Sequence, residues 1–105
     1  MSRPARNILL VKYDQLDFED EAPPVLEPMG TARELRDSLG IFNIAADGDP
    51  AERHVLHGPG VIVQMPLVGD DDEVRQLLVT INDDTIAWAV IMRLCRELRW
   101  RMMQA

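Results

Sequence analysis

The sequence predicts an α+β fold, in which a mostly antiparallel sheet of four or five short strands carries a long C-terminal helix and one short helix. Short apolar runs separated by turn residues recur along the chain, as strands require. A capped amphipathic segment begins at Thr31, and a longer apolar stripe with helical spacing begins after Asn82. A chain of 105 residues has the length of one domain, so we expect a single unit spanning residues 1–105.

Five apolar runs are the expected strands, at residues 7–13, 41–46, 53–57, 61–67 and 74–82. The first is apolar at successive positions, which predicts a central strand with apolar residues on both faces. Pro59 and Gly60 suit a type II turn before the fourth run, because that turn needs a positive φ at its third residue. Leu77, Val79 and Ile81 alternate toward an inner face, and we expect the last two runs to pair as an antiparallel hairpin.

Two helices are expected, and their starts have local signals. Thr31 and Glu34 match a capping box, in which each side chain bonds the other residue's backbone N–H, and this predicts a helix at residues 32–39 that ends before Gly40. The C-terminal helix should begin with Asp83 or Asp84 as its N-cap and continue to Met103. Its expected core-facing stripe consists of Ala87, Ile91, Leu94, Cys95, Leu98 and Met102.

An acidic, proline-containing loop is expected at residues 14–29. Pro23, Pro24 and Pro28 exclude a regular helix across it. Its first part, residues 14–21, contains five carboxylates and no basic residue, and Leu16 and Phe18 are the only large apolar residues there. We expect a long loop that is mobile or loosely docked on the rest of the domain.

The acidic balance of the chain limits its partners. The net charge of −7 repels phosphate backbones and anionic lipid headgroups, so we expect neither nucleic acid nor membrane as a partner. No apolar stretch approaches the roughly 18 residues of a membrane span, and the N-terminal run "ILLV" is too short for a secretory signal. The single cysteine, Cys95, excludes an intrachain disulfide. We therefore expect a cytoplasmic protein.

No motif indicates catalysis, so we expect no catalytic residue, no cofactor and no metal ligand. The chain lacks G-x-S-x-G, H-E-x-x-H and the phosphate-binding loop, and Cys95 falls on the expected buried stripe, where a thiol acts as a small apolar group. The alternative is a small-ligand or metal-binding domain, possibly an enzyme, that uses His54, His57 and the "GPG" turn. Against it, two residues three apart in a strand point to opposite faces.

Trp100 departs from the expected helix stripe. On a helical wheel it lies nearly opposite that stripe, in line with Arg93 and beside Arg96. Arginines in the last turns also complement the negative end of the helix dipole, which explains their charge without any function. Trp100 has three interpretations: packing under another part of this chain such as Leu16 and Phe18, contact with a second copy or a protein partner, or simple exposure near a fraying end.

These observations favour a non-catalytic protein-interaction module, such as an adaptor, a regulator or an assembly subunit. The predicted partner-binding residues are Trp100, Arg93, Arg96, Leu16 and Phe18, because tryptophan with arginine is typical of interface centres. Opposite charges further predict that the acidic residues 14–21 meet the C-terminal arginines, within one chain or between two. A pocket beside His57 would favour ligand binding instead, and an apolar patch around Trp100 would favour interaction.

Overall fold

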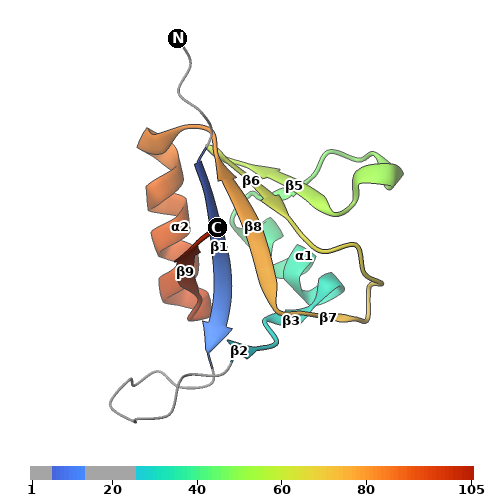
Figure 1. Ribbon diagram of the computed structural model, residues 1–105. Helices are drawn as coiled ribbons and strands as arrows, with labels where there is room; N and C mark the ends of the chain where they lie inside the picture. The colour runs from blue at the N-terminus through green and yellow to red at the C-terminus, as the bar shows by residue number, and fades with distance from the viewer. Residues whose placement is uncertain (1–5, 14–25) are drawn as a thin grey trace, which may run out of the picture.

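The computed structural model describes residues 6–13 and 26–105 and has the expected α+β class (Figure 1). The strands are β1 (Arg6–Tyr13), β2 (Leu26–Glu27), β3 (Gly30–Thr31), β4 (Ala45–Ala46), β5 (Val55–Gly58), β6 (Val61–Gln64), β7 (Glu73–Val74), β8 (Gln76–Ile81) and β9 (Arg101–Gln104). The helices are α1 (Ala32–Ile41), the short 3-10 helix η1 (Pro50–Glu52) and α2 (Asp84–Leu98).

The main sheet is antiparallel and contains more strands than the sequence predicted. Across the described residues it has seven strands in the order β2-β1-β8-β6-β5-β4, with β9 also paired to β1, and β3 and β7 form a separate pair. The additional strands are mostly two residues long, and one of them, β2, lies within the predicted loop at residues 14–29. Two residues are too few for a periodic pattern, so only the pairing of their backbone groups identifies such strands.

The central position predicted for the first strand is confirmed, because β1 pairs with β8 on one side and with β9 on the other. The predicted hairpin is also confirmed, since β6 pairs with β8 in an antiparallel register that places Val63 opposite Val79. The inner positions Leu10, Leu77 and Val79 are 0–1% exposed. Every strand of this central group therefore contributes one face to the same core.

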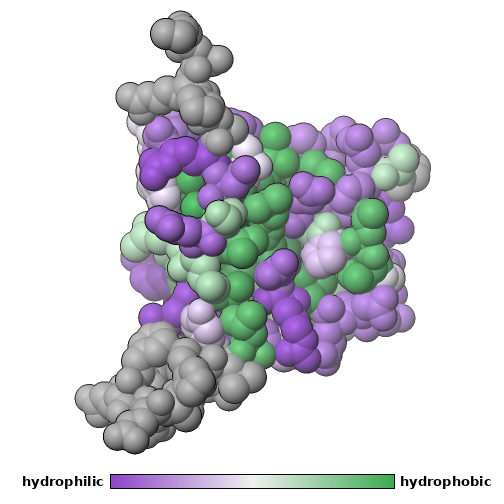
Figure 2. Space-filling view, in the orientation of Figure 1, coloured by the Kyte–Doolittle hydropathy of each residue, from purple (hydrophilic) through white to green (hydrophobic). Residues whose placement is uncertain are grey.

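Both helices pack on one face of the main sheet, and α1 lies behind β6 and β8 in Figure 1. Leu35 and Leu39 of α1 join Ala87, Ile91 and Leu94 of α2 in a single cluster with the inner residues of the strands. No polar or charged residue is buried among the described residues. Within residues 6–13 and 26–105 no helix packs on the opposite face, and Figure 2 shows a hydrophobic band along its middle.

The capping box of α1 is present as predicted. The backbone N–H of Glu34 donates to Thr31 Oγ1 over 3.2 Å, and the backbone N–H of Thr31 donates to Glu34 Oε1 over 3.0 Å. The predicted helix end was wrong by two residues, because Gly40 lies inside the helix and α1 continues to Ile41. The residue with a left-handed backbone conformation lies just beyond the helix and is Asn43, with φ of 63°. Asparagine adopts this conformation more readily than most residues.

The start of α2 follows the prediction, with Asp83 as N-cap accepting the Thr85 N–H over 2.9 Å. The predicted end at Met103 was wrong, because α2 ends at Leu98 and Arg99 adopts a left-handed conformation with φ of 60°. The chain then turns back, and residues 101–104 pair with β1 as β9. Hydrogen bonding to the open edge of β1 has overridden a sequence that would also form helix.

The turn between β5 and β6 has the positive φ that the predicted type II turn requires, with Gly60 at φ of 73°. The Gly60 carbonyl accepts the N–H groups of Asn82 and Asp83 over 2.8 and 3.2 Å. A side chain at Gly60 would place its Cβ 3.0 Å from the Ala87 nitrogen, so glycine is required here. This contact fixes the start of α2 against the sheet.

The core position of Leu94 gives the first prediction. Leu94 is 1% exposed, so Leu94→Ala should lower the free energy of unfolding by about 2–5 kcal/mol. Met92 lies two positions earlier on α2 and is 56% exposed, so Met92→Ala should change it by less than about 0.5 kcal/mol. Urea unfolding curves measure both values, and equal midpoints for the two variants would contradict this placement of α2.

Candidate functional site

A groove lies between the last turns of α2 and the first residue of β9. Its volume is about 380 Å³. We call it the arginine groove and define it by its lining residues, Met92, Cys95, Arg96, Arg99, Trp100 and Arg101. The floor is apolar, and the rim consists of guanidinium groups.

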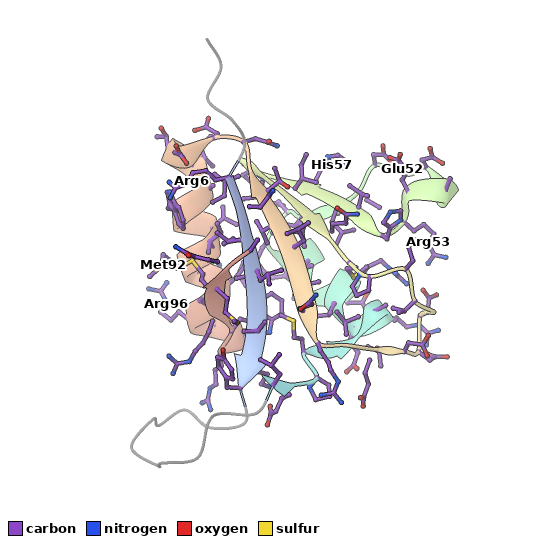
Figure 3. All side chains as sticks on the ribbon, in the orientation of Figure 1. Arg6, Glu52, Arg53, His57, Met92 and Arg96 are labelled. Atoms are coloured by element: carbon purple, nitrogen blue, oxygen red, sulfur yellow. The ribbon has the colours of Figure 1, made fainter. Side chains whose placement is uncertain are left out.

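The backbone reversal at Arg99 assembles this groove. Met92 and Arg96 are four residues apart on α2 and therefore lie on the same side of the helix, as Figure 3 shows. The left-handed turn at Arg99 directs Trp100 inward, where it is only 4% exposed and joins the core cluster. Trp100 therefore packs within its own chain, and its position on the predicted helical wheel does not apply.

The rim of the groove concentrates positive charge on an acidic protein. Arg96 and Arg99 are exposed, and neither makes an ion pair with another residue in the part of the chain that the structure describes. The chain as a whole carries a net charge of −7, so these groups oppose the sign of its average surface. A cationic patch of this kind attracts carboxylates from a distance of about one Debye length, roughly 8–10 Å at physiological salt.

The other predicted partner-binding residues lie elsewhere. Arg93 is outside the groove, with its guanidinium carbon 5.1 Å from the centre of the Phe42 ring and its Nε 3.5 Å from Glu97. Its predicted alignment with Trp100 was wrong, because that alignment required the helix to continue past Leu98. Leu16 and Phe18 lie outside the described residues. The structure therefore brings together Trp100 and Arg96, and their role in partner binding stays a prediction.

Cys95 contributes a half-buried thiol to the groove floor. Burial raises the pKa of the Cys95 thiol, because the thiolate loses hydration. The protonated form dominates at neutral pH, so this side chain is a weak nucleophile and a suitable apolar contact. The sequence analysis did not place Met92 or Cys95 in a site. The available signal was that Met92 lies four residues and Cys95 one residue before Arg96 on the same helix.

A second hollow of about 500 Å³ adjoins the start of α1 and is called here the His54 pocket. Its lining includes Arg36, Arg53, His54, Met65, Leu67 and Asp70. Arg36 forms a hydrogen-bonded ion pair with Asp70, and Arg53 Nη2 lies 3.5 Å from the same carboxylate. The hydrogen bond from Arg36 is the main cause that lowers the pKa of Asp70.

His57 does not share this pocket. It is exposed on β5 opposite Ile62, whereas the neighbouring Leu56 points into the core, so His57 lies on the helix-free face. The "GPG" turn packs on the start of α2 instead, through the Gly60 carbonyl. The two histidines and this turn therefore do not form the single site that the alternative function required.

Two further features of the described residues bear on function. Residues 6–13 and 26–105 contain no group of three or more histidine, cysteine, aspartate or glutamate side chains placed to hold a metal ion. No helix among these residues combines the length and the apolar character that crossing a bilayer demands.

Comparison with protein-family models, with curated proteins and with solved structures gave no match to this chain. The arginine groove and the His54 pocket are therefore the features from which a function can be inferred.

The lowered pKa of Asp70 gives the second prediction. A carboxyl group whose folded-state pKa is depressed stabilises the fold above its unfolded pKa, and this contribution is lost as the pH falls through the folded pKa. Asp70→Asn should therefore be less stable than the parent near pH 7, and the difference should shrink below about pH 4. Urea unfolding of both proteins from below about pH 4 up to about pH 7 measures this difference in the free energy of unfolding.

Asp71→Asn is the matched control, because Asp71 and its partner Arg33 are highly exposed and exposed pairs contribute little. A stability difference between the parent and Asp70→Asn that did not change with pH would contradict the role given to the Arg36–Asp70 pair.

Proposed function

We propose that this protein is a non-catalytic protein-interaction module, and that the arginine groove binds an acidic segment of a partner protein that carries an apolar anchor. The observation that supports this proposal is the combination of an apolar floor with three arginines on its rim. Guanidinium groups bind carboxylates through paired hydrogen bonds, and flexible methionine side chains adapt to different apolar anchors. Tryptophan and arginine are also enriched at the centres of protein interfaces.

Trp100 acts in this proposal as a support for the groove. It is 4% exposed, so its own surface offers little area to a partner. Met92 is 56% exposed and provides the main uncovered apolar surface beside the groove floor. The anchor of the partner would cover Met92 and Cys95, while the carboxylates of the partner would contact Arg96 and Arg99.

The backbone conformation of Arg99 adds a second argument. A residue with a Cβ is disfavoured in the left-handed region by roughly 1–2 kcal/mol, and glycine is the usual choice at the end of a helix. The chain nevertheless has an arginine at this position, on the rim of the groove. The helix dipole accounts for a positive charge there, but it does not account for the apolar hollow beside that charge.

A synthetic peptide with the sequence DQLDFEDE is a suitable probe, because it combines five carboxylates with leucine and phenylalanine. We expect it to bind the full chain, and its amide analogue NQLNFQNQ to bind more weakly. Binding of the acidic peptide should weaken as salt is added, because both partners are exposed charges that salt screens. Isothermal titration calorimetry measures both affinities, and bound peptide should slow alkylation of Cys95 because it covers the thiol.

Arg99→Gly separates binding from folding and gives the third prediction. The substitution removes a guanidinium from the rim but relieves the left-handed strain, so the protein should remain as stable as the parent or gain up to about 1 kcal/mol. Its affinity for the acidic peptide should fall about two- to fivefold, as the loss of one exposed ion pair implies. Calorimetry and urea unfolding of the same preparation provide the two measurements.

Arg93→Ala is the matched control, because it removes the same charge from the last turns of α2, close in sequence to Arg99 but outside the groove. Equal losses of affinity for Arg93→Ala and Arg99→Gly would mean that the peptide responds to the overall positive charge in this part of the chain and does not bind in the groove, which would contradict the proposal. Equal binding of the acidic peptide and its amide analogue would also contradict the proposal.

A second candidate function is binding of a small carboxylate-bearing ligand in the His54 pocket. The observation that favours it is a hollow of about 500 Å³, within the usual size range of ligand sites, that contains Arg53 and His54. Arg36 is already paired with Asp70, so Arg53, which is more exposed and more loosely held, is the available anion-binding group. This pre-existing pairing makes the candidate weaker than the arginine groove.

Titration with succinate, followed by amide chemical shifts, tests this candidate and is the fourth prediction. Shifts should be confined to residues around the His54 pocket, and Arg53→Ala should abolish them. Arg75→Ala is the control, because Arg75 is equally exposed and lies outside the pocket. The absence of localised shifts at millimolar succinate would eliminate this second function.

A further inference from the structure

The helix-free face of the main sheet carries a continuous apolar surface. Side chains alternate along each strand, so the residues that flank the core-facing positions point outward. We call this surface the open face, and its apolar members with accessible surface are Leu9, Ile62, Leu78 and Met103. They come from β1, β6, β8 and β9, so the surface extends across the middle of the sheet.

The strand register makes these side chains neighbours. Leu9 lies opposite Leu78 on one side and opposite Met103 on the other, which forms one apolar row across three strands. Leu9, Ile62 and Leu78 are half-buried and Met103 is 41% exposed, so each retains surface that another molecule can cover. The hydrophobic band in Figure 2 runs along this part of the molecule.

The polar groups of the open face carry almost no charge. Thr80 and Asn7 pair in the row next to Leu9 and Leu78, and the Thr80 hydroxyl donates a hydrogen bond to Asn7 Oδ1 over 2.9 Å. The outward positions of β1, β5, β6, β8 and β9 include no aspartate or glutamate, although the chain contains 18 of them. Arg101, at the border with the arginine groove, and His57 on β5 are the charged or basic groups there.

We propose that two copies of this protein associate through their open faces to form a two-fold symmetric dimer. Each copy carries a net charge of −7, so two copies that met through acidic surfaces would repel each other. Contact through the open faces avoids this repulsion, because it brings no carboxylate of one copy against the other. Its amide and hydroxyl groups both donate and accept hydrogen bonds, so the face is complementary to itself. Arg101 and His57 are its few charged or basic groups, so the open face has little charge with which to select a foreign partner, whereas sheets stacked face to face are a common packing.

The concentration dependence of the mass tests this proposal directly. Sedimentation velocity of the full chain from low micromolar to millimolar concentration should show the mass rise from 11.9 kDa toward twice that value. Added salt should strengthen the dimer, because it screens the repulsion between two copies of net charge −7. Peptide binding in the arginine groove should weaken with salt, so the two proposals respond in opposite directions and can fail independently.

Leu78→Arg places a charge in the apolar row, directly opposite Leu9, and should raise the dimer dissociation constant by about tenfold or more. Leu67→Arg is the matched control, because Leu67 is 83% exposed and lies in the loop that lines the His54 pocket, away from the open face. It should leave the dissociation constant unchanged. If Leu78→Arg does not fold by circular dichroism, Ile62→Arg takes its place, and the salt series on the parent needs no variant.

Two results would overturn the proposal. The parent chain could remain at 11.9 kDa at every concentration and salt level, which would leave the open face without a second copy. Leu67→Arg could weaken the dimer as much as Leu78→Arg, which would place the contact elsewhere.

Discussion

Burial of one sheet face under both helices is the constraint on which the other features depend. Leu10, Leu77 and Ile91 are 0% exposed, and they come from the first strand, the penultimate strand of the main sheet and the long helix. Apolar burial contributes roughly 25 cal/mol per Å², so residues of this kind provide most of the stabilisation in so small a domain. A chain of 105 residues can build one such core, and none of the helices among the described residues covers the second face of the sheet. The open face and the outer side of α2 are therefore consequences of how the core is placed.

The same arrangement links the arginine groove to the stability of the fold. Trp100 is at once the floor of the groove and a member of the core cluster, and it is held in place by the reversal at Arg99. A truncation at Trp100 would therefore disturb packing as well as binding. The rim behaves differently, because Arg96 and Arg99 are exposed and contribute little to the core. The rim is where function can change independently of folding.

The sequence predicted those parts of the structure whose signals are local. Both halves of the capping box, Thr31 and Glu34, lie within four residues, and the alternation along β8 is visible without any knowledge of its partners. The end of α2 has no such signal, because residues 99–104 contain no glycine, proline or asparagine and would also form helix. Residues 101–104 form a strand because they pair with the edge of β1, which is distant from them in the sequence. The same limit applies to the candidate site: Arg96 and Trp100 line one groove, whereas Arg93 was included because the helix was expected to continue.

The position of β1 has a consequence for the folding reaction. Its two long neighbours, β8 and β9, come from the opposite end of the sequence, and Ile8 lies opposite Val79 on one side and opposite Gln104 on the other. Closing a loop of this length costs about 4 kcal/mol of chain entropy before the contact is repaid, and such non-local pairing slows folding. Until β9 docks, one edge of β1 exposes its backbone donors and acceptors, and the cavity that Trp100 fills is empty. A chain in which β9 had not docked would present a free strand edge beside an apolar surface, which is the combination that favours edge-to-edge aggregation.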